Sequence, residues 1–204
     1  MRSGLVTLIV LFFFISAEVV ALSPHDAPKK KLSVSKVSAV RAPGLKIMSR
    51  GKASPETMKD FLLRYNGEAD EATVKRLVRV YIIEANREGV NYEVAFCQMC
   101  LETGFLKFEG SVSKYQHNYC GLGCVDIFSG GDWFASMEEG VRAHVQHLKA
   151  YASVEPVRSP MVDPRFGNVR RGTVNTVTEL AGKWATDPDY GRKITALISR
   201  LYSL

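Results

Sequence analysis

Apolar residues recur at helical spacing through most of the chain beyond Ser54. Between Asp70 and Gly89 they follow a single helix face, and the residues on it are Val74, Leu77, Val78, Tyr81 and Ile82. Asp70 suits the N-cap of this helix because its side chain accepts from free backbone N–H groups, and Gly89 suits its C-terminal end. The pattern therefore predicts a helix that ends near Gly89.

Other segments combine this spacing with helix-boundary residues. Ser54 before Pro55 is typical of a helix start, and Ser136 with Glu139 forms a capping box. The further predicted helices cover about 54–65, 91–104, 136–148, 173–184 and 190–202. We find no internal repeat and no sustained strand alternation, although 115–134 has room for a short hairpin or an irregular loop. The sequence thus predicts a mostly α fold.

Length and composition divide the chain into three parts. Residues 54–204 form about 150 residues, an ordinary size for one hydrophobic core. Residues 1–22 read as a signal peptide, because Arg2 precedes an apolar run from Leu5 to Ile15 and small residues follow. The apolar run is shorter than the roughly 20 residues that span a bilayer, although an uncleaved anchor stays an alternative. We expect an exported protein, periplasmic or extracellular.

Residues 23–53 read as a flexible basic linker. They contain three prolines and the run Lys29, Lys30 and Lys31, without helical periodicity. The positive charge is expected to attract anionic wall polymers or lipid headgroups, with a simple tether as the alternative. The whole chain carries a formal charge of +6, much of it in the leader and linker, so we expect no nucleic-acid partner.

Glu102 is the candidate for acid chemistry. Asn91 is a plausible N-cap and Gly104 a stop for the helix between them, which places Glu102 in the last turn. The negative end of the helix dipole and apolar neighbours both favour the protonated carboxyl. A carboxyl that keeps its proton near neutral pH can protonate the leaving oxygen of a glycosidic bond. The alternative is a surface Glu near a helix end.

Four short motifs occur in an informative order: LETG at 101–104, NYCGLG at 118–123, GVRAHVQHL at 140–148 and WATDPDY at 184–190. In this order and approximate spacing they resemble the bacterial glucosaminidase family, the peptidoglycan hydrolases of glycoside hydrolase family 73. The resemblance covers most of the chain from about Leu77 onward. It implies a lysozyme-like helical fold with a substrate groove, and the stretch at 115–134 of this chain predicts a short irregular or hairpin lobe beside that groove.

The resemblance also implies roles for individual residues. Glu102 is the expected general acid, and the ring of Tyr190 is expected to border the site, with a core position as the alternative. The turn after the acid is expected to bind substrate through Asn118, Tyr119, Gly121 and Gly123. Trp184 is expected to be a core residue.

A second catalytic group is harder to assign. The segment between Cys124 and Ser136 is short where many relatives carry a longer lobe. Asp126 is the best-placed second carboxylate, with Glu109 and Asp132 behind it. Assistance by the N-acetyl group of the substrate is the other route, and it needs no carboxylate nucleophile.

The four cysteines surround the expected site: Cys97, Cys100, Cys120 and Cys124. In an exported protein such a cluster favours disulfides, with structural zinc or buried free thiols as alternatives. A redox CxxC site is weaker, because Cys97 and Cys100 lie inside a helix. His117, His144 and His147 form no HExxH arrangement, so we expect no catalytic metal, and no cofactor is implied.

Together these features predict an exported endo-β-N-acetylglucosaminidase that cuts the glycan strands of peptidoglycan. Two alternatives remain: muramidase or lytic transglycosylase chemistry on the same fold, and a wall-binding module without turnover. Nothing supports a peptide-cleaving amidase, since no Cys-His or metal-His constellation appears in the expected context.

Overall fold

The computed structural model describes residues 46–124 and 130–204. The predicted signal peptide, most of the predicted linker and Asp126 lie outside the described residues. Within them the chain forms five α-helices and three short 3-10 helices, with isolated β-bridges and no extended strand. The prediction of a mostly α fold is confirmed.

The helices begin and end close to the predicted positions. They are α1 (Pro55–Tyr65), α2 (Glu71–Glu88), α3 (Tyr92–Glu102), α4 (Met137–Ala152) and α5 (Tyr190–Leu201). The 3-10 helices are η1 (Lys114–Gln116), η2 (Phe166–Asn168) and η3 (Val177–Leu180). The predicted caps Ser54, Asp70, Asn91 and Ser136 each accept a backbone N–H at the start of a helix.

One predicted helix is wrong. Residues 173–184 form only η3, because the backbone before it is bonded to distant segments. Val174 N–H donates to the Tyr151 carbonyl, and Thr176 forms a β-bridge with Lys46. These tertiary contacts replace the local i→i−4 bonds that a helix would need.

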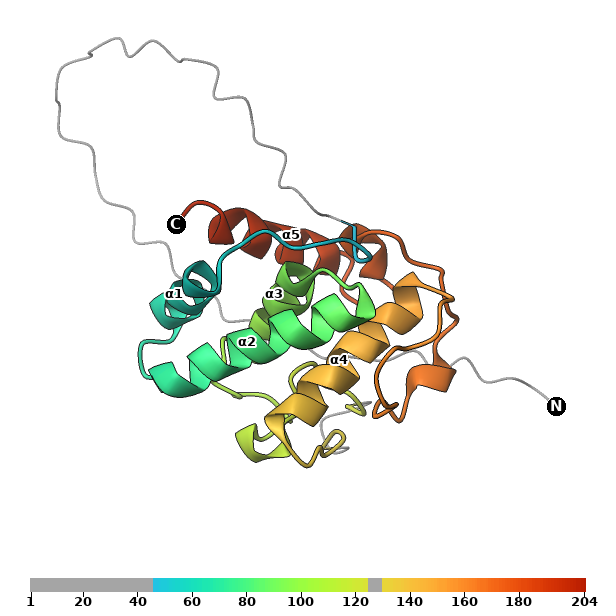
Figure 1. Cartoon of the computed structure of the whole chain (residues 1–204), viewed down its shortest axis with the longest axis horizontal. Coiled ribbons are helices and arrows are strands. Elements are labelled where there is room, and N and C mark those ends of the chain that lie inside the picture. Colours follow the sequence, from blue (N-terminus) through green and yellow to red (C-terminus); the bar gives the residue numbers. More distant parts are fainter. Residues whose placement is uncertain (1–45, 125–129) are drawn as a thin grey trace, which may run out of the picture.

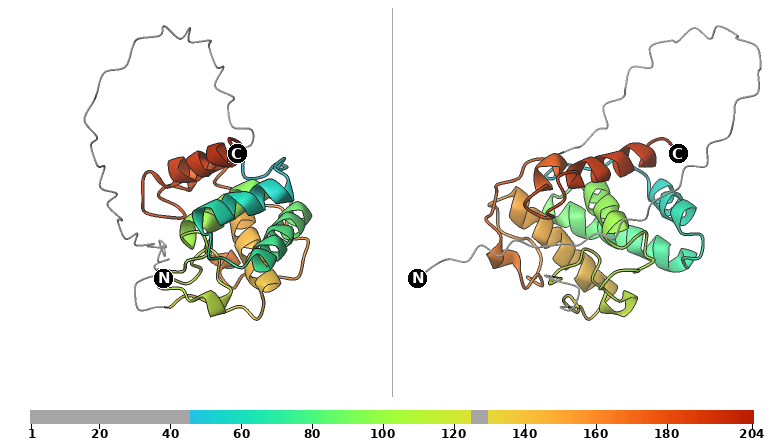
Figure 2. Two further views of the ribbon diagram at one scale, coloured as in Figure 1. Left: turned by 90° about the vertical axis from the view of Figure 1, so that its left-hand side faces the viewer. Right: turned by 180° about the vertical axis from the view of Figure 1, so that it is seen from behind.

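Helix α3 lies at the centre of the molecule, between α2 and α5 (Figure 1). All residues from Tyr92 to Cys100 are buried, so α3 has no polar face and is enclosed all round. Helix α2 packs most extensively against α4 and also against α1, while α5 packs along α3 and η3 (Figure 2). The core thus surrounds a rigid central helix, and Glu102 is the last residue of that helix.

The folded body begins before Ser54, which corrects the predicted linker boundary. Ile47 is fully buried, its N–H donates to the Asn175 carbonyl, and its own carbonyl accepts from Asn91. The N–H groups of Lys52 and Ala53 both donate to the buried Glu93 carboxylate. Residues 46–53 are therefore a packed part of the domain.

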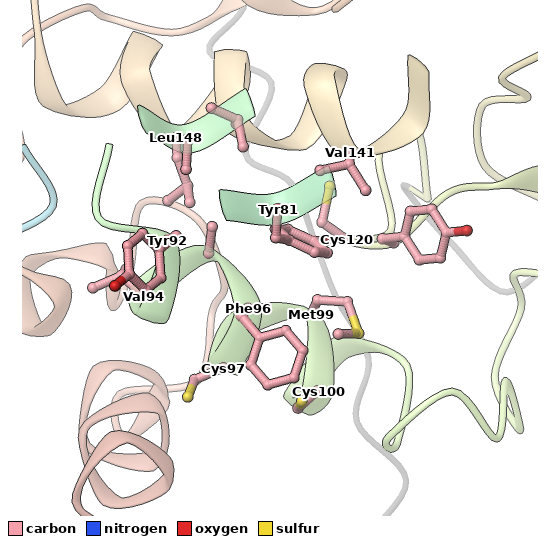
Figure 3. Close-up of a cluster of buried hydrophobic side chains, with 14 of the residues drawn as sticks. Tyr81, Tyr92, Val94, Phe96, Cys97, Met99, Cys100, Cys120, Val141 and Leu148 are labelled. Atoms are coloured by element: carbon pink, nitrogen blue, oxygen red, sulfur yellow. The ribbon is translucent and has the colours of Figure 1, made fainter. Parts of the chain in front are cut away.

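The expected disulfides are also corrected. Cys97, Cys100 and Cys120 carry free, buried thiols that fill space in the hydrophobic core (Figure 3).

Burial raises the pKa of all three of these thiols, so they are neutral at ordinary pH. No group of three or more metal-binding side chains occurs in the described residues.

No helix in this part of the chain has the length and apolarity that crossing a membrane requires.

Candidate active site

The carboxyl of Glu102 sits where α3 ends, and its side chain is half-buried. Two groups from the distant C-terminal part of the chain donate to its Oε1 atom. Tyr190, the first residue of α5, donates through its hydroxyl, and Trp184 donates through Nε1 at 3.2 Å. Both donors are fully buried. The sequence motif at 184–190 therefore closes over the end of the central helix.

The surroundings of Glu102 favour its neutral form. Burial raises the pKa of Glu102 to about 7, although the hydrogen bonds from Tyr190 and Trp184 favour the ionised form and oppose this rise. The direction agrees with the expectation from the sequence, since desolvation is the larger effect. A carboxyl with this pKa is protonated in a large fraction of molecules near neutral pH and can act as a general acid.

The second oxygen of Glu102 faces the glycine turn. A Cβ atom added to Gly121 would lie 4.0 Å from Glu102 Oε2, and Gly121 has a φ of +68°. Since Oε1 already accepts two hydrogen bonds, the proton of the neutral acid belongs on Oε2. The oxygen that carries the proton of the neutral carboxyl therefore faces the turn that the sequence predicted to hold substrate.

Asn118 organises this turn from within. Its side-chain amide donates to the carbonyls of Leu122 (2.8 Å) and Asp132 (3.1 Å), and its oxygen accepts from Leu122 N–H (3.0 Å). Because Asn118 is 1% exposed and its polar atoms are used in these bonds, it shapes the turn and does not offer them to substrate.

Tyr119 and Gly123 also differ from the expectation of direct binding. Tyr119 is 5% exposed and packs against Phe108 and Tyr81, so its ring is not an open stacking surface. Gly123 is buried beneath Asp132 and Arg165, where a Cβ atom would approach both within 2.7 Å. Of the four predicted binding residues, Gly121 alone is placed next to the acid by a contact in the structure.

The candidates for a second carboxylate are not equivalent. Asp126, the first choice, lies outside the described residues. Glu109 is exposed, and Asp132 is held by Arg165, whose Nε and Nη2 atoms lie 2.7 and 3.2 Å from its two oxygens. This bidentate pair joins the turn to η2, so Asp132 has a structural partner.

The chain immediately after Glu102 has an unusual backbone. Phe105, Leu106 and Phe108 all have φ values between +52° and +66°, a region that side chains disfavour. Thr103 stabilises this turn, since its hydroxyl donates to the Met99 carbonyl and accepts from Leu106 N–H. Backbone conformations of this kind concentrate at functional sites. Here the bonds of Thr103 hold the turn that ends α3.

Sequence reasoning missed the contacts of Trp184, Gln98 and His144. Trp184 is a core residue as expected, but its indole N–H also reaches the acid. Gln98 donates to Tyr190 at 2.7 Å, and His144 lies 3.1 Å from Gln98. The only signal in the sequence was that Trp184 and His144 fall inside the matched motifs.

A half-buried acid with a raised pKa at the end of a central helix is the kind of group that glycoside hydrolases use as a proton donor. The comparison with family models specifies the class further: the model described as mannosyl-glycoprotein endo-beta-N-acetylglucosaminidase matches residues 78–203. The chain belongs to this glucosaminidase family, as the motifs predicted. It is a glycoside hydrolase.

Similar proteins agree with this assignment. An uncharacterized protein of Borreliella burgdorferi is 45% identical over 155 residues, which cover 76% of each chain. Two crystal structures of S. aureus autolysin E, one with the muropeptide NAM-L-Ala-D-iGlu and one of a catalytic mutant with the disaccharide NAG-NAM, have TM-scores of 0.51. They are 16% and 15% identical and align with 78% of this chain and 70% of theirs. This likeness confirms the lysozyme-like helical fold.

Proposed function

We propose that the protein is an exported peptidoglycan hydrolase of the endo-β-N-acetylglucosaminidase type, with Glu102 as its general acid. The observation that carries the proposal is the Glu102 carboxyl itself. Tyr190 and Trp184 occupy one of its oxygens, burial raises its pKa to about 7, and its other oxygen faces the glycine turn. This arrangement suits proton transfer to the leaving oxygen of a glycosidic bond.

Peptidoglycan as substrate is supported by family and fold together. The autolysin E structures contain NAM-L-Ala-D-iGlu and NAG-NAM, which are fragments of that polymer. We propose that the present chain binds the same alternating glycan strand across the acid. The expected signal peptide at 1–22 would deliver the protein to the wall, and the basic residues of the linker would hold it near anionic polymers.

The second chemical step has two proposed routes. In the first, Asp126 acts as base or nucleophile. In the second, the N-acetyl group of the substrate attacks the anomeric carbon, and no second carboxylate is required. Replacing Asp126 with Asn separates them, because the first route then loses most of its turnover while the second keeps it.

The deciding experiment is digestion of purified peptidoglycan by a chain that begins after residue 22, beside its Glu102→Gln variant. Products are reduced with borohydride and identified by mass spectrometry. We expect new reducing-end N-acetylglucosamine from the unmutated protein, and a loss of about 10²- to 10⁴-fold in the variant, because the amide has no proton to donate. Glu68→Gln is the matched control and should keep full activity, since Glu68 is exposed in the turn between α1 and α2.

Other products would redirect the assignment. Reducing-end muramic acid would indicate a muramidase, and anhydro-muramic ends would indicate a lytic transglycosylase. Binding without any product would indicate a wall-binding module. Equal turnover by the unmutated protein and the Glu102→Gln variant would refute the role of Glu102 in all three enzyme classes.

A further inference from the structure

A chain of four buried side chains runs from Glu102 into the core. Tyr190 donates to Glu102 and accepts from Gln98 Nε2 at 2.7 Å. Gln98 Oε1 lies 3.1 Å from His144 Nε2, and His144 Nδ1 lies 2.9 Å from the Tyr81 hydroxyl. These four residues are fully buried and come from α5, α3, α4 and α2 respectively. One hydrogen-bonded chain therefore connects the acid to four of the helices.

The chemistry of the donors fixes the direction of this chain. An ionised Glu102 accepts only, so Tyr190 must donate to it, and the Tyr190 oxygen then accepts from the Gln98 amide. The Gln98 oxygen is left facing His144 Nε2, which must carry the hydrogen. His144 Nδ1 is then the acceptor for Tyr81. With Glu102 ionised, only the neutral His144 tautomer that carries its hydrogen on Nε2 satisfies every bond.

The opposite direction would disable the acid. It requires His144 to carry its hydrogen on Nδ1 and the Gln98 amide to face the ring. Tyr190 would then donate to Gln98, and Glu102 would hold its proton on Oε1, where Tyr190 accepts it. A proton in that position points into the core and away from Gly121.

The neighbouring ionisable groups do not reverse the chain. Burial, reinforced by His147, lowers the pKa of His144 to about 3, so the ring stays neutral at every pH well above this value. His147 is bonded to Asp163 at 2.8 Å. Near the acid, burial raises the pKa of the Cys120 thiol, so this group is neutral as well.

We infer that Gln98 and His144 are positioning residues for the acid. They fix the direction of the Tyr190 hydroxyl, so that Glu102 Oε1 stays an acceptor and the transferable proton stays on Oε2. This inference rests on the proposed role of Glu102, but the position of the proton is measurable without substrate.

The composition of the core supports a role beyond packing. A fully buried Gln or His is costly unless its hydrogen bonds are made, and apolar residues of similar size would fill the same space. Gln146 on α4 is equally buried, but it bonds to the loop at 159–163 and so secures the fold. Within the described residues, the Gln98 amide bonds only to Tyr190 and His144.

The test compares Gln98→Met with Gln146→Met, two changes of the same type at equally buried positions. The Glu102 pKa is measured by ¹³C NMR of labelled glutamate carboxyls, with Glu102→Gln to assign the signal. Gln98→Met frees the Tyr190 hydroxyl, which weakens its bond to the ionised acid. We expect a higher Glu102 pKa and about a tenfold lower kcat with little change in KM. Gln146→Met should lower stability and leave both the Glu102 pKa and kcat unchanged.

A double-mutant cycle shows whether Gln98 acts through Tyr190. In a Tyr190→Phe background, Gln98→Met should cause no further change in the Glu102 pKa. An additive change in that background, or equal pKa values in the Gln98→Met and Gln146→Met proteins, would overturn the inference.

A further readout does not depend on a folded Gln98 variant. The ¹⁵N shifts of His144 in the unmutated protein should show hydrogen on Nε2, and hydrogen on Nδ1 would contradict the inferred direction. Tyr81→Phe removes one hydroxyl at the far end of the chain, so it should raise the Glu102 pKa less than Gln98→Met. If the unmutated protein cleaves no glycan but these shifts appear, the proposed activity fails while the positioning chain stands.

Discussion

Glu102 carries a cost for stability that follows from its chemistry. In the folded protein its pKa is about 7, against 4.5 for an ordinary Glu, so the folded state binds the proton more tightly than the unfolded state. Between these two values the unfolded chain releases its proton first, and the free energy of unfolding falls as the pH rises. Above pH 7 the free energy of unfolding has fallen by the full amount that this titration causes.

Glu102→Gln removes this titration. We expect the variant to be more stable than the unmutated protein at pH 8, by at most about 3 kcal/mol, with the advantage shrinking as the pH falls toward 4.5. Urea unfolding at several pH values measures it. An advantage that is equal at pH 4.5 and pH 8 would contradict the raised pKa. With Glu102 as the proposed general acid, the same titration should make kcat/KM fall as the pH rises through about 7, because only the protonated carboxyl can donate a proton.

Gly121 offers a second test at the level of one residue. Gly121→Ala introduces a Cβ at a φ of +68°, about 4.0 Å from Glu102 Oε2, on the side where we propose that substrate binds. Gly182→Ala is the matched control, because its φ is +73° and a Cβ there meets nothing within 4 Å. We expect both variants to lose about 1 kcal/mol of stability from the backbone conformation, and only Gly121→Ala to lose turnover. Similar turnover in both variants would contradict the idea that substrate binds between Gly121 and Glu102.

Among the helices, α3 depends most on its cap. Asn91 is fully buried, accepts from the N–H groups of Glu93 (2.9 Å) and Val94 (3.3 Å), and donates to Ser49. In Asn91→Ala no water can replace these bonds, so we expect a loss of about 2 kcal/mol. Asp70→Ala removes the exposed cap of α2 and should cost about 1 kcal/mol. Midpoints of urea unfolding compare the two, and equal losses would contradict a role for burial.

The elements were predictable where local chemistry decides them. Asp70, Asn91 and Ser136 cap their helices because short polar side chains satisfy free N–H groups without any tertiary contact. Residues 173–184 were not predictable, since their backbone bonds to Tyr151 and Lys46, which are distant in sequence. Glu102 was singled out mainly by the family motifs, since its place at a helix end alone suits a surface Glu equally well, and the donors to its carboxyl were only partly foreseen.

At the scale of the molecule, the site depends on contacts that no local pattern contains. Trp184 and Tyr190 lie more than 80 positions from Glu102, and Gln98 and His144 are joined across two helices. The family motifs indicated Tyr190 as a neighbour of the site. They did not indicate that Asn118 and Tyr119 would be buried, because a motif records identity and not the direction of a side chain.

Residues 46–53, which precede α1, decide where the folded domain begins. Ile47 is fully buried, and the N–H groups of Lys52 and Ala53 bond to the Glu93 carboxylate, which is 1% exposed. A chain that begins at Pro55 loses the apolar contact and leaves Glu93 with the Tyr202 hydroxyl as its remaining partner from outside α3. A buried carboxylate without donors is costly.

We therefore expect the chain 55–204 to be much less stable than 46–204, or not to fold. Ile47→Ala measures the apolar part alone and should cost about 3 kcal/mol, because it empties a fully enclosed site. Ile83→Ala is its control, since Ile83 is 54% exposed and should change stability by less than about 0.5 kcal/mol. Equal unfolding midpoints for the chains 55–204 and 46–204 would show that residues 46–53 do not stabilise the domain and belong to the linker. A large loss in Ile47→Ala would make this segment a part of the fold that holds the start of α3, the eleven-residue helix that ends at Glu102.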